Sequence, residues 1–141
     1  MNRITNFIAL ILLAGIISIV SCQPEESATP NPNGDRDNFV GSWKCQEKST
    51  RYNSTSTYTL KIINDTALAS YIFIENIYEL GNSYKAHAIV NGGLFTIPQQ
   101  AVSGNTIQGN GNLQSQVLMN MNYWVNDGVV TDTVTAILTK Q

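Results

Sequence analysis

The sequence is poor in the side chains that most enzymes use for chemistry. Its 141 residues include one histidine and two cysteines, and charged residues make up only 13% of the chain. So few ligands do not readily build a zinc or iron–sulfur centre, and a catalytic triad would depend on the single histidine. We therefore expect a protein that is not an enzyme and that needs no metal or other cofactor.

Clusters of positive charge are also missing. Eight Lys and Arg face ten Asp and Glu, which gives a formal net charge of −2. Nucleic-acid backbones are bound through clustered Lys and Arg side chains, so a nucleic-acid partner is not expected. Apolar residues nevertheless reach 43% of the chain, which is enough for the core of one small domain and excludes disorder throughout.

The one long hydrophobic run lies near the start of the chain, where Arg3 precedes the segment FIALILLAGIISIV at residues 7–20. Fourteen helical residues rise about 21 Å at ~1.5 Å per residue, which is less than the roughly 30 Å of a bilayer's hydrocarbon core. The pattern therefore favours a cleaved secretory signal over its alternative, a transmembrane helix.

The hydrophobic run ends at Ile19, Val20, Ser21 and Cys22, which resemble the lipobox of bacterial lipoproteins. The resemblance implies that residues 1–21 are removed and that Cys22 is acylated with a thioether-linked diacylglycerol and an amide-linked chain such as palmitate. Several acyl chains hold a soluble domain on a bilayer stably, whereas one chain binds only marginally. The implied location is the bacterial cell envelope, with an anchor in the outer membrane at its surface or its periplasmic face. An ordinary thiol at Cys22 is the alternative.

The segment 22–37 is expected to be a flexible tether. After Cys22 it holds three of the four prolines and a single alanine as its only apolar residue, a composition that gives a semi-extended linker. Its residues 23–26 (QPEE) are similar to the acidic export signal of many Bacteroidetes lipoproteins, although an ordinary acidic linker has the same pattern. We predict a signal at 1–21, the tether at 22–37 and a folded domain at 38–141.

From residue 38 onward the chain has the pattern of an all-β domain. Apolar and polar residues alternate with a period of two, and turn residues separate the alternating segments. The pattern predicts seven to nine strands. Because successive strands look hairpin-connected and closure removes exposed edges, we expect a single antiparallel meander barrel, with a β-sandwich as the alternative. The clearest alternation lies at residues 117–125, where one face of the strand is expected to carry Val117, Met119, Met121, Tyr123 and Val125.

Three turn predictions accompany these strands. Asp127-Gly128 has the favoured chemistry for a two-residue hairpin. Pro98 is expected to end its strand, and Gly111-Asn112 to form a turn. The inner face of the strand that follows the hairpin is expected to carry Val130, Val134, Ala136 and Leu138.

The domain as a whole is similar to a group of small Bacteroidetes lipoproteins with lipocalin-like barrels. The similar segments lie at 37–43, 72–81, 97–104, 126–128, 131–136 and 139–140. The Phe-x-Gly-x-Trp opening of the first segment is the lipocalin-like feature, and it implies that Trp43 plugs one end of the barrel. The resemblance implies a fold and an address, but no defined activity.

Two aromatic residues are the most suggestive candidates for a binding surface. Trp124 shares a strand face with Asn residues, and Tyr78 lies in an irregular central segment. A Trp among amide side chains can stack on a sugar ring or line the mouth of a barrel, or it can cover a neighbouring loop.

Four further residues have specific predictions. Cys45 shares a face with Trp43, so we expect a small buried hydrophobic residue, with an intermolecular disulfide or a nucleophile as the alternatives. His87 is expected on an outer face, in contact with solvent. Thr66 and Thr133 each follow Asp and precede an aliphatic residue, which resembles the O-glycosylation site of exported Bacteroidetes proteins.

The leading hypothesis is a lipid-anchored, non-enzymatic barrel that meets an envelope protein or a glycan through its outer surface. One alternative is a lipocalin-like carrier of a small hydrophobic molecule. Another is a glycan hydrolase, which needs two carboxyl groups roughly 5 to 10 Å apart in a cleft. Because small barrels are often filled by their own side chains, the outer-surface hypothesis is favoured.

Overall fold

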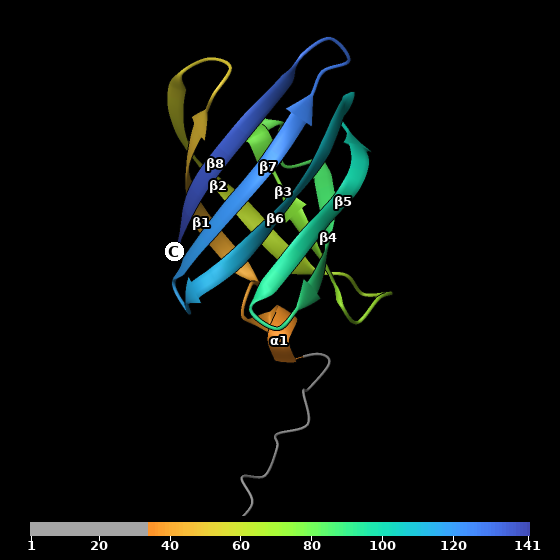
Figure 1. Cartoon of the computed structure of the whole chain (residues 1–141). Helices are drawn as coiled ribbons and strands as arrows, with labels where there is room; N and C mark the ends of the chain where they lie inside the picture. Colours follow the sequence, from red (N-terminus) through yellow and green to blue (C-terminus); the bar gives the residue numbers. More distant parts are fainter. Residues whose placement is uncertain (1–33) are drawn as a thin grey trace, which may run out of the picture.

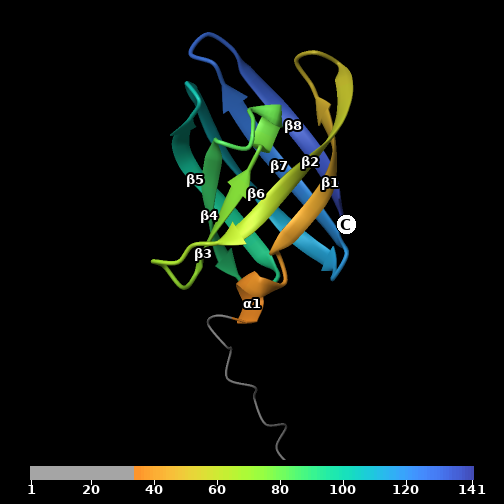
Figure 2. The same cartoon turned by 180° about the vertical axis from the view of Figure 1, so that it is seen from behind.

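The structure is a computed structural model of the chain, and it describes residues 34–141. Eight antiparallel strands form a closed barrel in which each strand pairs with the next and the last pairs with the first (Figures 1 and 2). The predicted meander barrel is confirmed, and the β-sandwich is wrong. In chain order the strands are β1 (Gly41–Ser49), β2 (Ser54–Asn64), β3 (Tyr71–Glu75), β4 (Lys85–Asn91), β5 (Leu94–Val102), β6 (Asn105–Ser115), β7 (Leu118–Asn126) and β8 (Thr131–Lys140).

Alternate residues of each strand point into the barrel, as the period-two pattern predicts. Two residues expected inside are exposed instead, because Val117 lies in the turn between β6 and β7 and Val130 lies in the loop between β7 and β8. The interior is filled by large side chains, and the largest that are fully buried include Trp43, Tyr123, Phe39, Phe95, Leu60, Ile62, Ile72, Ile74, Ile77, Ile97, Ile107 and Met119.

Trp43 closes one end of the barrel, as the lipocalin-like resemblance implies. Its indole Nε1 donates a hydrogen bond of 2.7 Å to the carbonyl oxygen of Phe39, and the Lys140 ammonium lies 5.3 Å from the ring centroid, within cation–π range. Phe39 in turn packs edge-on against Phe95, with ring centroids 5.5 Å apart. These buried aromatic contacts seal the end at which the described chain enters β1.

The short helix α1 (Gly34–Asp37) lies at this same end (Figure 1). Arg36 Nη1 donates to the carbonyl oxygens of Asp65 at 2.8 Å and Leu68 at 2.9 Å, in the loop after β2. These contacts attach α1, which precedes the predicted start of the domain at residue 38, to the barrel. Within the part of the chain described, no helix is long and apolar enough to cross a membrane.

Pro98 does not end its strand, contrary to the prediction. β5 continues through it by means of a bulge, at which the pairing with β6 shifts between Ile97 and Gln100. Proline has no N–H for the ladder and is tolerated at such irregularities. The Gln100 carboxamide bridges to β4 instead, because its Oε1 accepts from the His87 N–H at 2.9 Å and its Nε2 donates to the His87 carbonyl at 2.8 Å.

The predicted turn at Gly111-Asn112 is also wrong, because both residues lie within β6. A Cβ atom at Gly111 would lie 2.2 Å from Cζ of Phe95, and one at Gly109 would lie 2.5 Å from Cβ of Tyr123. Glycine in a strand interior commonly marks such a close approach rather than a turn. The two glycines therefore make room for aromatic residues of the neighbouring strands.

Candidate functional site

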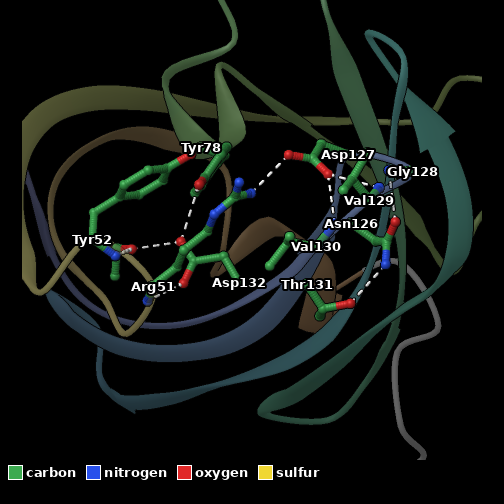
Figure 3. Close-up of polar contacts among 11 residues, drawn as sticks. Arg51, Tyr52, Tyr78, Asn126, Asp127, Gly128, Val129, Val130, Thr131 and Asp132 are labelled. Atoms are coloured by element: carbon green, nitrogen blue, oxygen red, sulfur yellow. Dashed lines mark hydrogen bonds and ion pairs between the residues drawn. The ribbon is translucent and has the colours of Figure 1, made fainter.

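The barrel end opposite α1 brings together the turn after β1, the 3-10 helix η1 (Ile77–Glu79) and the loop after β7 (Figure 2). Asp132 lies at the start of β8, directly after that loop, and is 1% exposed; it joins β8 to the other two segments. Its Oδ2 accepts from Ser49 Oγ at 2.6 Å and from the Tyr78 hydroxyl at 3.0 Å, and its Oδ1 accepts from the Arg51 N–H at 2.9 Å. Figure 3 shows Asp132 with its partners Tyr78 and Arg51.

Tyr78, a predicted binding residue, helps to close this end of the barrel. Its ring packs edge-on against Tyr123 with centroids 6.3 Å apart, and its backbone has a left-handed φ of 55°, which is uncommon for a bulky residue. Burial and the hydrogen bond to Asp132 raise the pKa of Tyr78, so its hydroxyl stays a donor. Tyr78 covers the end of the barrel, whereas Trp124 lies on the outer face of β7, so the structure does not combine the two into one surface.

An ion pair links the two loops at the rim of this end. Arg51 Nη1 lies 2.7 Å from Asp127 Oδ2 (Figure 3). The hydrogen bond from Arg51, followed by the N–H groups of Val130 and Val129, holds the pKa of Asp127 well below its usual range. The rim therefore carries two charges that neutralise each other.

The Asp127-Gly128 hairpin prediction is corrected here. Asn126 pairs with Thr131 across β7 and β8, which leaves the four residues 127–130 in the loop. Asp127 Oδ1 accepts from the N–H groups of both Val129 and Val130. These bonds from a side chain to the following backbone stabilise a wider turn than Asp-Gly alone indicates.

A second buried carboxylate lies inside the barrel. Glu47, 4% exposed, accepts a hydrogen bond of 2.6 Å from the Tyr58 hydroxyl and another from the Tyr123 hydroxyl. Burial, together with the nearby carboxylate, raises the pKa of both tyrosines, so they remain donors. These two hydrogen bonds join β1, β2 and β7 across the interior.

Cys45 lies next to this network and is buried and free of a disulfide. Burial, and to a lesser extent the charge of Glu47, raises the pKa of its thiol to about 12. A thiol held in this way is not a nucleophile near neutral pH. The prediction of a small buried residue is confirmed. Among residues 34–141, no three His, Cys, Asp or Glu side chains converge as ligands for a metal ion.

The sequence analysis missed both buried carboxylates, although a signal for them was present. Glu47 and Ser49 continue the inward alternation of Trp43 and Cys45, and Asp132 precedes the inward Val134 by two positions. These side chains were not predicted to be buried because they are polar, although their positions in the period-two alternation place them inside the barrel.

Trp124 lies at a hollow on the outer surface of the barrel. The side chain is 38% exposed, and its strand neighbours are Gln108 on β6 and Thr133 on β8. The hollow has a volume of about 260 Å³ and is lined by Gln99, Thr106, Gln108, Trp124, Asn126 and Thr131.

Asn126 is fixed in position at the edge of this hollow. Its Nδ2 donates to Thr131 Oγ1 at 2.7 Å, and its Oδ1 accepts from the Gly128 N–H at 2.7 Å. The four-residue loop after β7 therefore orients one wall of the Trp124 hollow. Another part of the lining, Gln99, lies at the bulge in β5. The sequence analysis did not predict this bulge.

A second hollow on the outer surface serves as a comparison. It has a volume of about 200 Å³ and lacks an aromatic side chain. Its lining consists of Lys44, Gln46, Thr57, Ile137 and Thr139.

The remaining candidate residues do not line the Trp124 hollow, although Thr133 is the β8 neighbour of Trp124. Thr66 is exposed in the loop after β2, and Thr133 is exposed on the outer face of β8. His87 is exposed on β4, as predicted. O-glycosylation of the two threonines stays a prediction, and Cys22 lies outside the described residues.

Comparisons with known proteins identify a fold but no family. No protein-family model matches the chain, and no curated protein matches it. Among solved structures, a redesigned β-barrel has a TM-score of 0.58 at 12% identity and covers 76% of this chain and 95% of its own.

Two further structures are similar to the same degree. EF1p2_mFAP2b bound to DFHBI has a TM-score of 0.58 at 12% identity, covering 76% of this chain and 97% of its own. The redesigned β-barrel mFAP1 bound to DFHBI has a TM-score of 0.56 at 12% identity, covering 75% of this chain and 98% of its own. At this identity the likeness establishes the β-barrel fold alone.

Proposed function

We propose that this protein is a lipoprotein of the bacterial envelope, anchored in the outer membrane through Cys22, and that its barrel is a non-enzymatic module that binds a protein or a glycan through its outer surface. The observation that carries the proposal is the position of Trp124, a large, partly exposed aromatic side chain at a hollow on the outside of the closed barrel. Exposed Trp is enriched where proteins bind partners.

The filled interior supports an outer surface over an inner cavity. Trp43 and Phe39 occupy one end of the barrel, Phe95 packs on Phe39, and Tyr123 lies beneath Tyr78 at the other end. An interior ligand would have to displace side chains that pack closely, at a cost in stability.

The direction of the chain also suits an anchored module. α1 lies at one end of the barrel, and β7 runs toward the other end, where Trp124 is the third residue from the end of the strand (Figure 1). A tether that enters at α1 would present the Trp124 end away from the bilayer.

Acylation is tested by expressing the full chain in a Gram-negative host that is fed an alkyne analogue of palmitate. We expect the wild-type chain to carry the label and to partition into the detergent phase. The Cys22→Ser variant should lose both properties, and Cys45→Ala, which changes the other cysteine, should keep both. Labelling that persists in Cys22→Ser would contradict the anchor.

Recognition is tested with the photo-cross-linker benzoylphenylalanine in producing cells. Placed at Gln108, in the Trp124 hollow, it should form a light-dependent adduct. Placed at Thr139, in the comparison hollow, it should not. Trp124→Ala should remove the adduct at Gln108. Equal adducts at both positions, or none at Gln108, would contradict the proposed surface.

A carrier of a small molecule is the second candidate, because two structurally similar barrels are bound to DFHBI. In this chain, entry at the end opposite α1 would require Tyr78 to leave Asp132. Native mass spectrometry of the full chain distinguishes the candidates. A reproducible excess mass of a few hundred daltons that is lost on denaturation would favour the carrier.

A further inference from the structure

We infer that the Trp124 hollow is a binding site for a neutral sugar ring. The inference rests on the proposed function, because it names the chemical class that the outer surface recognises. Three features carry it: the exposed indole, the hydrogen-bonding groups around it, and the absence of charge among the six residues that line the hollow.

The exposed indole provides the apolar platform. Trp combines a flat apolar face with a polar N–H at its edge, and a pyranose ring presents C–H groups on its faces and hydroxyl groups around its edge. Trp124 is partly exposed at the hollow, so part of the indole is accessible to a ligand. Its neighbours Gln108 and Thr133 on the adjacent strands hold it in a regular ladder.

The side chains around the indole are suited to hydroxyl groups. A carboxamide offers donors and an acceptor, and a hydroxyl offers both, as sugar hydroxyls do. Asn126 uses one N–H for Thr131 and accepts from Gly128, which leaves a second N–H and a second lone pair for a ligand. Three carboxamides and two hydroxyls line the hollow, from Gln99, Gln108, Asn126, Thr106 and Thr131.

The charge of the surroundings selects a neutral ligand. None of the six lining residues is charged, and the nearby carboxylate of Asp127 is paired with Arg51 at 2.7 Å. Phosphate and carboxylate ligands are bound mainly through Arg and Lys, and nucleic acids need a basic groove. A neutral saccharide satisfies the lining without an unpaired charge.

Size and composition favour a sugar over a protein partner. At about 260 Å³ the hollow is smaller than the ~300–1,000 Å³ of pockets that enclose whole ligands, so it suits one ring of a longer chain. Protein hot spots are aromatic side chains in desolvated, well-packed pockets. Here no aliphatic side chain lines the hollow, and the Trp is surrounded by amides and hydroxyls.

Binding is tested with the full chain purified in a detergent without a sugar headgroup, since a glycosidic detergent would compete. The probes are soluble glucan, mannan, xylan and galactan, with heparin and polygalacturonate as charged comparators. Trp43 is fully buried and Trp124 is partly exposed, so a change in tryptophan emission reports on the hollow. We expect a saturable blue shift with at least one neutral polysaccharide and none with the charged ones.

Variants locate the site by calorimetric titration with the polysaccharide that binds. Trp124→Ala should weaken the affinity about tenfold or more, in line with the loss of one aromatic stacking contact. Gln108→Ala should weaken it about threefold by removing one hydrogen bond. Ile137→Ala, in the comparison hollow, should leave it unchanged. Each variant must keep the wild-type circular dichroism spectrum.

Each outcome is decisive. If none of the four neutral polysaccharides binds, or if binding survives Trp124→Ala, the sugar inference fails. A cross-link from position 108 to a protein would then retain the proposed surface while the sugar inference is rejected. If the cross-link at that position is also missing, the proposed surface fails as well.

Discussion

Replacing Asp132 with Ala tests whether one buried carboxylate holds the end of the barrel together. The carboxylate accepts hydrogen bonds from Ser49, from Tyr78 and from the N–H of Arg51, at 2.6, 3.0 and 2.9 Å respectively. Ser49 and Arg51 come from the end of β1 and the turn that follows it, and Tyr78 comes from η1. The substitution therefore disconnects both segments from β8.

The expected loss follows from the number and type of these bonds. A hydrogen bond to a charged group contributes roughly 1.5–3 kcal/mol, and a buried donor left without a partner costs about 1–3 kcal/mol. The three bonds share one acceptor and are not additive, so we expect Asp132→Ala to lower the free energy of unfolding by about 3–4 kcal/mol in total. At about 4–8 °C per kcal/mol for small domains, the melting temperature should fall by more than about 10 °C.

The effect should depend on pH in a defined direction. Burial alone would raise the pKa of Asp132, but the hydrogen bonds from Ser49, Arg51 and Tyr78 outweigh it and lower that pKa. A carboxyl group whose pKa is lower in the folded state stabilises the fold above its unfolded pKa of about 4. That contribution is lost as the pH falls through the folded pKa. The gap in stability between wild type and Asp132→Ala should therefore shrink below about pH 4.

Urea unfolding followed by circular dichroism at pH 7 and pH 3 measures both effects. Asp127→Ala is the matched control, because it removes a carboxylate from the same end of the barrel. The ion pair and the turn hydrogen bonds of Asp127 are exposed to solvent, so they should stabilise the fold less than the buried bonds of Asp132 do. If Asp132→Ala costs no more than Asp127→Ala at pH 7, or if the gap between wild type and Asp132→Ala is unchanged at pH 3, the role assigned to the buried carboxylate is refuted.

Three further predictions follow from contacts elsewhere in the barrel. Gly111→Ala should lower the free energy of unfolding by about 1–3 kcal/mol, because its Cβ would collide with Phe95, whereas Gly93→Ala, with open space around it, should be near neutral in thermal unfolding; equal effects would contradict the packing. Cys45, with its pKa raised to about 12, should resist iodoacetamide at pH 8 in the folded protein and react fully in urea; rapid labelling of the folded chain, seen by mass spectrometry, would argue against burial. Gln100→Ala should accelerate amide exchange in β4 by removing the side-chain bridge, and unchanged exchange would show that the bridge is dispensable.

Much of the fold is encoded in local alternation, which a sequence displays directly. Met119, Met121 and Tyr123 face inward as predicted, because side chains of a strand alternate between faces with a period of two. The failures involve contacts between distant segments. Gly111 has the composition of a turn, but its role depends on Phe95 of the neighbouring strand. Pro98 is accommodated by a bulge in the pairing of β5 with β6.

The candidate site was predictable only in part for the same reason. Trp124 is recognisable because it interrupts an amide-rich face, yet the hollow beside it requires Gln99 and Thr106 from β5 and β6. Their proximity depends on strand register and on a bulge, neither of which is encoded near Trp124. The separation of Tyr78 from this surface likewise depends on Asp132, a residue far from it in sequence.

Closure of the barrel between β1 and β8 constrains the order in which the chain can fold. Seven of the eight strand pairings join consecutive strands, while the pairing from Trp43↔Lys140 to Ser49↔Val134 joins the two extremes of the domain. Hairpins can form early because their strands are close in sequence, but the pairing of β1 with β8 cannot form until the whole domain is available. A polypeptide threaded across a membrane from its N-terminus would therefore remain open, with β1 unpaired along one edge, until its final strand has emerged.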